Sequence, residues 1–174
     1  GAGAEAENII FTKNCTEALN MAIKGILKKG DHVITTMMEH NSVLRPLFSA
    51  KKYGIESSIL RCSSQGYPES GSLEKALKKN TKMIICTLSS NVTGTIMPVE
   101  ELGAFADKHG IIFIIDAAQG LGSIPFDAEK CKAHAVAASG HKSLMGPQGT
   151  GFLYIDSTIR LQHIIEGGTG TESL

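Results

Sequence analysis

The sequence has no excess of charge of either sign, because its 174 residues include 17 Lys or Arg and 17 Asp or Glu residues. It also lacks a basic stripe, so we expect no nucleic-acid partner. No apolar run reaches the roughly 18 residues of a membrane span, and residues 1–8 lack the basic and apolar regions of a secretory signal peptide. These absences predict a cytoplasmic chain that has no membrane partner.

The cysteines and histidines lack the spacings of disulfide frameworks and metal sites. Cys15, Cys62, Cys86 and Cys131 form no CxxC pair, which predicts free thiols in a reducing compartment. We find no ligand-like spacing among His32, His109, His134 and His163 or between them and the cysteines, so we expect no metal site.

The common nucleotide-binding fingerprints are missing as well. Lys142-Ser143 follows His141 instead of the glycine of a GxxxxGK[ST] loop, and residues 120–122 lack the third glycine of GxGxxG. The glycines of residues 146–151 stand in the wrong order for either motif. Such glycine clusters more often mark turns, which disfavours a nucleotide-binding module.

Apolar runs alternate with amphipathic helical patterns along the chain. We expect strands at residues 8–12, 33–36, 55–61, 83–88, 111–115, 133–138 and 151–155, and helices at residues 16–29, 43–53, 72–79 and 98–108, with Thr16 and Ser72 as helix caps. The alternation predicts one α/β domain with three α/β/α layers around a mixed, mostly parallel sheet.

Several polar residues directly follow predicted strands. They are His40, Asn91, Asp116, Gln119 and the run from Ser139 to Lys142. Ligands of parallel sheets bind beyond the carboxyl ends of the strands. We therefore expect these residues to lie at one edge of the sheet.

Each of these residues has more than one interpretation when considered alone. Asp116 fits a helix cap, a salt bridge with a cation, or a Mg²⁺ ligand, although the last needs the missing phosphate loop. His40 fits a helix cap or a side chain that lies flat against a planar ligand. Cys15-Thr16-Glu17 opens a predicted helix and fits either a phosphate site or a plain N-cap.

Lys142 is the only lysine after Lys132, and it follows a predicted buried strand. Ser139 and His141 offer phosphate donors beside it. A phosphate site, an imidazole, a carboxylate and a single amine at one edge suit a phosphorylated, planar aldehyde. The set therefore predicts pyridoxal 5′-phosphate (PLP), bound to Lys142 as a Schiff base.

Five sequence motifs occur in an order that resembles a known family. They are Asn14-Cys15-Thr16-Glu17-Ala18-Leu19-Asn20, Glu39-His40-Asn41-Ser42, Ser90-Asn91-Val92-Thr93-Gly94-Thr95, Asp116-Ala117-Ala118-Gln119 and Ser139-Gly140-His141-Lys142. Over residues 9–170 the chain resembles the large domain of fold-type-I PLP enzymes of the class V aminotransferase-like group. Within that group it is similar to cysteine desulfurases and selenocysteine lyases.

The resemblance implies a role for each site residue. Lys142 would form the Schiff base and move protons at the substrate Cα, and His40 would stack on the pyridine ring and assist proton transfer. Asp116 would pair with the pyridinium nitrogen, which keeps the ring able to accept electrons. The other implied contacts are Gln119 with the ring phenolate oxygen, Asn91 near substrate and cofactor, and Cys15, Thr16, Ser139 and His141 with the phosphate.

The resemblance also implies an activity for the full-length protein. It would be a cysteine desulfurase that converts L-cysteine to L-alanine and transfers sulfur to an enzyme persulfide. An acceptor protein would then take the sulfur for iron–sulfur clusters or thiolated cofactors. The alternatives are a selenocysteine lyase, an aminotransferase or an epimerase of the same class, or an inert domain fragment.

We expect residues 1–174 to be a PLP-binding large domain, truncated at both ends, from a homodimeric protein with a further C-terminal small domain. The glycine-rich residues 167–170 are a candidate for the dimer interface. The family's persulfide cysteine and substrate-binding arginine belong to that C-terminal region, and none of the cysteines or arginines of this chain stands in a matching motif. Cys15 stands where many relatives have threonine, and we interpret it as a tolerated small residue.

Overall fold

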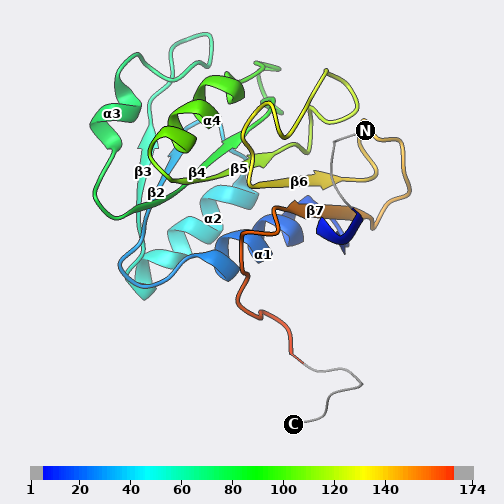
Figure 1. The fold of residues 1–174 in the computed structure, drawn as a ribbon. Helices are drawn as coiled ribbons and strands as arrows, with labels where there is room; N and C mark the ends of the chain where they lie inside the picture. The colour runs from blue at the N-terminus through cyan, green and yellow to red at the C-terminus, as the bar shows by residue number, and fades with distance from the viewer. Residues whose placement is uncertain (1–5, 167–174) are drawn as a thin grey trace.

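The computed structural model describes residues 6–166, so the predicted interface loop at 167–170 lies outside it. Within the described residues, seven strands form one sheet in the order β1-β7-β6-β5-β4-β2-β3 (Figure 1). The strands are β1 (Ile9–Thr12), β2 (His32–Thr36), β3 (Glu56–Leu60), β4 (Thr81–Thr87), β5 (Ile112–Asp116), β6 (Ala135–Ser139) and β7 (Gly151–Ile155).

The sheet is mixed and mostly parallel, as predicted. Neighbouring strands from β3 through β6 are parallel, whereas β7 is antiparallel to both β6 and β1. β1 therefore runs in the same direction as β6. The carboxyl ends of β1, β2, β4, β5 and β6 consequently lie at one edge of the sheet.

Helices cover both faces of the sheet and complete the predicted three layers (Figure 1). α1 (Cys15–Ile26) and α2 (Asn41–Ala50) lie on one face, and α3 (Ser72–Ala76) and α4 (Val99–Lys108) lie on the other. Short 3₁₀ turns occur at Ala6–Asn8 (η1) and Lys51–Tyr53 (η2). None of the described helices is both long and apolar enough to cross a membrane.

Two apolar clusters hold the layers together, one on each face of the sheet. Leu19, Ala22 and Ile23 of α1 recur at helical spacing and are at most 1% exposed, so they form one buried stripe against the sheet. Phe113 points into the other cluster with the buried residues of α4. All five residues of β5 are buried, as expected for a central parallel strand.

The predicted cap at Thr16 was wrong. Asn14 is the N-cap of α1, because its extended backbone leaves Oδ1 free to accept a hydrogen bond from the Glu17 N–H at 2.9 Å. The helix also ends at Ile26, not at Lys29, since Leu27 is already extended.

The predicted cap at Ser72 was wrong as well. α3 begins at Ser72 and has Gly71 as its N-cap, with φ at 70°. The Ser72 hydroxyl is buried without a hydrogen-bond partner among residues 6–166. α3 ends at Ala76 because Leu77 adopts an extended backbone.

Candidate active site

A cavity of about 300 Å³ opens at the carboxyl edge of the sheet. It is lined by Asn14, Cys15, Thr16, His40, Ser42, Thr87, Ser89, Asn91, Asp116, Ala118, Gln119, Ser139, His141 and Lys142. The folded chain thus brings all nine predicted site residues to one place, from the ends of five strands. Its volume is at the lower end of the range for small-molecule sites.

Asp116 is the most buried charged residue of the cavity, with 3% of its surface exposed. Its Oδ1 accepts hydrogen bonds from the Cys15 thiol at 3.3 Å and the Ala118 N–H at 3.0 Å. No Lys or Arg forms an ion pair with it among residues 6–166. Within the described chain, these two local donors compensate the burial of this carboxylate.

Lys142 is half-buried in the tight loop that follows β6. Two backbone hydrogen bonds close this loop: the Gly140 N–H donates to the Thr150 carbonyl at 2.8 Å, and the Gly146 N–H donates to the Gly140 carbonyl at 2.7 Å. Met145 takes a left-handed backbone with φ at 55° at the sharpest point. The closed loop fixes the lysine beside the end of β6 and leaves its amine at the cavity.

His40 caps α2 and also lines the cavity. Its Nδ1 accepts from the Ser42 N–H at 3.1 Å and lies 2.8 Å from the Ser42 hydroxyl. That hydroxyl is 2.7 Å from the Thr16 hydroxyl on α1. The capping interpretation is therefore confirmed, and the chain of hydrogen bonds joins the N-termini of α1 and α2. Ser42 had not been predicted as a site residue, although it closes the Glu39–Ser42 motif.

Gln119 and Asn91 reach the cavity from two loops. The Gln119 carbonyl accepts from the Ser143 hydroxyl at 3.4 Å, which joins the turn after β5 to the lysine loop. Asn91 is exposed in the loop after β4, which is closed by the Ser90 N–H donating to the Thr95 carbonyl at 2.9 Å. Both residues line the cavity, Gln119 half-buried and Asn91 exposed.

Glu39 is a buried acid that sequence reasoning did not single out. It is 7% exposed, and its Oε1 accepts from the Thr36 hydroxyl at 2.7 Å. Its Oε2 is buried with no hydrogen-bond partner within residues 6–166. Burial raises the pKa of Glu39 to about 8, and the Thr36 hydrogen bond opposes this rise only in part. Its position just before His40 was visible, but its burial was not.

The residues of the cavity fit PLP. Lys142 supplies a primary amine for the aldehyde, and Asp116 supplies a carboxylate for the ring nitrogen. The first N–H groups of α1, at Cys15 and Thr16, face outward at a helix N-terminus, where an anion is favoured. The Ser139 hydroxyl and the His141 imidazole complete a donor set for the phosphate.

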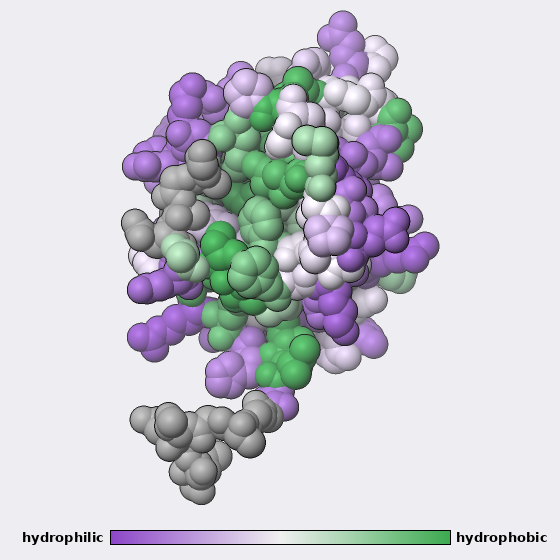
Figure 2. Space-filling model, turned by 90° about the vertical axis from the view of Figure 1, so that its right-hand side faces the viewer, coloured by the Kyte–Doolittle hydropathy of each residue, from purple (hydrophilic) through white to green (hydrophobic). Residues whose placement is uncertain are grey.

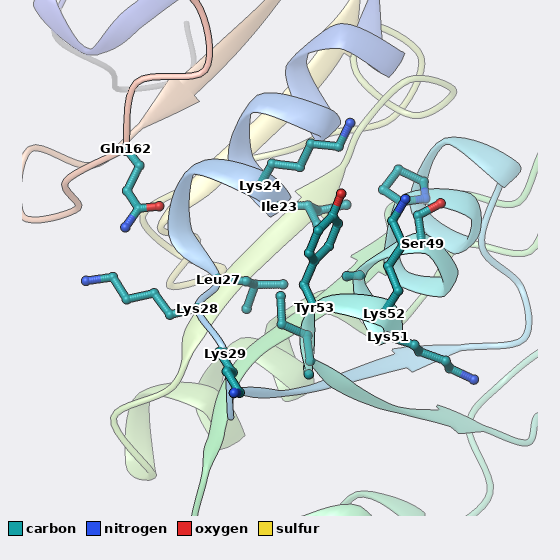
Figure 3. Close-up of a pocket in the computed structure, with 14 residues that line it drawn as sticks. Ile23, Lys24, Leu27, Lys28, Lys29, Ser49, Lys51, Lys52, Tyr53 and Gln162 are labelled. Atoms are coloured by element: carbon teal, nitrogen blue, oxygen red, sulfur yellow. The ribbon is translucent and has the colours of Figure 1, made fainter.

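A second, larger hollow of about 1230 Å³ lies at the far ends of α1 and α2 (Figure 3). Its floor is apolar, with Ile23, Leu27 and Ile55, and lysines stand around it. The lysines are Lys24, Lys28, Lys29, Lys51 and Lys52. No carboxylate, histidine or cysteine lines this hollow, so its lysines have no acid or imidazole beside them, unlike Lys142 in the smaller cavity. The smaller cavity is therefore the candidate active site despite its size.

The sheet order and the lysine-containing cavity at its carboxyl edge define the large domain of a fold-type-I PLP enzyme. Residues 2–173 match the family model of the class-V aminotransferases. The chain belongs to the class-V aminotransferase family.

Similar proteins carry related names. A cysteine desulfurase IscS of Dictyoglomus turgidum is 38% identical over 171 residues, which are 96% of this chain and 43% of that protein. A probable cysteine desulfurase of Pyrococcus abyssi is 41% identical over 157 residues, covering 88% of this chain and 39% of that protein. The chain thus spans less than half the length of these relatives.

Solved structures agree with the sequence matches. The apo structure of the cysteine desulfurase of Thermococcus onnurineus superposes with a TM-score of 0.92 at 37% identity, covering 99% of this chain and 44% of that one. SspA in complex with cysteine superposes with a TM-score of 0.89 at 32% identity, covering 96% of this chain and 50% of that one.

Proposed function

We propose that the protein containing this chain is a PLP-dependent cysteine desulfurase. It converts L-cysteine to L-alanine and transfers the sulfur atom to an enzyme thiol, which becomes a persulfide. The observation that carries the proposal is one cavity that holds Lys142, Asp116 and His40 together. The names of the relatives and the cysteine complex of SspA support the choice of substrate.

The residues of the chain divide the work in this proposal. PLP, when bound, accepts the electron pair that is released at the substrate Cα. Lys142 would hold the aldehyde and move the Cα proton, and His40 would contact the ring and assist that transfer. Asp116 would balance the charge of the protonated ring nitrogen, so that the ring would keep its capacity to accept electrons. A lysine beside a buried carboxylate and an imidazole suits such proton transfers.

The remaining site residues hold the cofactor in place. We assign the phosphate to the N–H groups of Cys15 and Thr16 and to the side chains of Thr16, Ser139 and His141. Gln119 would hold the ring phenolate oxygen. Asn91 would line the site near substrate and cofactor.

We assign the sulfur-accepting thiol to a part of the protein outside this chain. Cys15, Cys86 and Cys131 are buried, and burial raises the pKa of each thiol, which disfavours the reactive thiolate. Cys62 is half-buried, and burial raises its pKa as well. Nucleophilic cysteines are instead partly exposed and have a lowered pKa.

We further propose a cytoplasmic homodimer that passes its sulfur to an acceptor protein of iron–sulfur cluster assembly. Apolar side chains gather on the face seen in Figure 2. Large exposed apolar side chains of the chain include Phe11 on β1, 87% exposed, and Met145, 90% exposed. Extended apolar patches are unusual on monomers and suit an interface, which supports the dimer.

The experiment has a cofactor arm and a reaction arm. Addition of PLP to the chain should produce a visible absorption band, and borohydride reduction followed by peptide mass spectrometry should locate the label on Lys142. K142A should lose the band, while K79A, which changes an exposed lysine, should keep it. Label on another lysine, or no band, would overturn the cofactor assignment.

The reaction arm uses the longer protein. With L-cysteine and a reductant it should release L-alanine and sulfide in equal amounts, and K142A should release neither. Turnover of selenocysteine without turnover of cysteine would replace the proposal with a selenocysteine lyase. No turnover of any amino acid by a PLP-loaded protein would leave only a binding domain.

A further inference from the structure

Cys15 makes a contact that its interpretation as a tolerated small residue does not explain. It is the first residue of α1, it is 5% exposed, and it lines the cavity. Its Sγ lies 3.3 Å from Oδ1 of Asp116, which is 101 positions away in the sequence. The distance is that of a hydrogen bond from a thiol to a carboxylate.

The direction of this hydrogen bond follows from the charge state of the thiol. Burial, the negative charge of Asp116 and the hydrogen bond to it together raise the pKa of the Cys15 thiol far above its ordinary range. The positive charge of Lys142 opposes this rise but does not reverse it. The sulfur therefore keeps its proton at neutral pH and donates it to Asp116.

The Asp116 carboxylate is held from two sides. The Cys15 thiol approaches Oδ1 from α1, and the Ala118 N–H approaches the same oxygen at 3.0 Å from the turn after β5. No hydrogen bond reaches Oδ2 within the described part of the chain. The two donors thus fix the rotation of the carboxylate and leave its second oxygen for a ligand in the cavity that Asp116 lines.

Close packing at the end of β7 brings α1 near enough for this contact. Gly151 lies against the backbone before Cys15: a Cβ at position 151 would be 2.7 Å from the carbonyl carbon of Asn14 and 2.8 Å from the carbonyl oxygen of Ala138. Only glycine allows this approach. The fold therefore places the thiol at Asp116 through a packing contact independent of the thiol itself.

We propose that Cys15 is a positioning residue, which orients the Asp116 carboxylate toward the ring nitrogen of PLP. The role rests on the proposed cofactor. An S–H group is a weaker donor than a hydroxyl, so it orients the carboxylate while withdrawing little of the negative charge that the ring nitrogen needs. The thiol acts through Asp116 and takes no part in bond making or breaking.

The first test is spectroscopic and needs no cofactor. The S–H stretching band of Cys15, isolated as the infrared difference between wild type and C15A, should lie at the frequency of a hydrogen-bonded thiol. In a D116A background, which lacks the acceptor oxygen, the same difference should move toward the frequency of a free thiol. An unchanged band would overturn the proposed contact.

The second test measures the affinity for PLP. C15A should weaken binding by about three- to tenfold, as expected for the loss of one hydrogen bond to a charged group. C15S keeps a donor and should stay within about twofold. C131A removes an equally buried thiol remote from the cavity, so it should lower stability without changing the affinity.

The binding results for wild type, C15A and C131A test the positioning role of Cys15 separately from the assignment of PLP as the cofactor. PLP bound by C15A with wild-type affinity would overturn the role and leave the proposed function intact. No PLP binding by the wild-type chain would overturn both. Equal losses of affinity in C15A and C131A would show that Cys15 acts only through packing, which would also overturn the role.

Discussion

Burial changes the chemistry of single residues in this site. Glu39 and Cys15 are both acids whose pKa rises because burial disfavours the charged form. Neither effect can be read from the residue type, since an exposed glutamate or cysteine at the same position would titrate in its ordinary range. The sequence thus identifies which residues can ionise, whereas burial in the folded chain determines whether they carry a proton at neutral pH.

Glu39 gives the chain a specific dependence of stability on pH. Its pKa is about 8 in the folded protein and near 4.5 when unperturbed, so between these values the folded state keeps a proton that the unfolded state releases. Rising pH therefore favours unfolding across this window, with a slope of at most about 1.4 kcal/mol per pH unit from this group.

E39Q keeps a neutral side chain at every pH and should lack this part of the dependence. Urea unfolding at several values between pH 5 and pH 8 measures the effect. E69Q, which changes an exposed glutamate, should follow wild type. Parallel stability curves for E39Q and wild type would show that Glu39 is ionised in the folded state.

Close approaches between elements depend on two glycines. Gly103 of α4 lies against the Cys131 carbonyl, where a Cβ would overlap the backbone, and Gly151 of β7 lies against the residues before α1. Both contacts join a helix to a segment distant in sequence. The sequence does not predict these close backbone contacts, because each glycine would fit equally well in a turn.

These two glycines predict a matched pair of variants. G103A and G151A should each lower the free energy of unfolding by about 1–3 kcal/mol, because backbone must shift to admit the methyl group. Only G151A moves the start of α1, so only G151A should also weaken PLP binding. Urea unfolding and titration with PLP measure the two effects. A loss of affinity in G103A equal to that in G151A would contradict this assignment.

The cavity belongs to the whole molecule, because it exists only where the ends of five strands and two helix N-termini meet. A ligand that spans these segments binds the folded chain alone. PLP at 100 times its dissociation constant should therefore stabilise the chain by about 2.7 kcal/mol.

The shift in the urea midpoint on addition of PLP measures this linkage. Pyridoxal, which lacks the phosphate, should stabilise less at the same concentration, because the α1 terminus then binds nothing. K142A should reduce the stabilisation that PLP provides, but the part that comes from the phosphate contacts should remain. Equal shifts with PLP and pyridoxal would count against a phosphate site at Cys15 and Thr16.

The sequence by itself determined the element order, the three layers and the set of polar residues at the strand ends. It could do so because apolar periodicity and strand-end position are local patterns, and because parallel strands must end at one edge. The five ordered motifs also pointed to the family. Errors lay at the ends of helices and strands, as at Thr16 and Ser72, where Asn14 and Gly71 had equally good local chemistry.

Only the tertiary structure decided between the alternative roles of single residues, such as cap or cavity residue, and showed which distant residues are in contact. It showed His40 as both a cap and a cavity residue, gave Asp116 a thiol and a backbone N–H as hydrogen-bond donors, and buried Glu39. The Cys15–Asp116 contact joins residues 101 positions apart. Such contacts depend on how closely helix and sheet pack, and close packing is a property of the folded chain rather than of any segment of it.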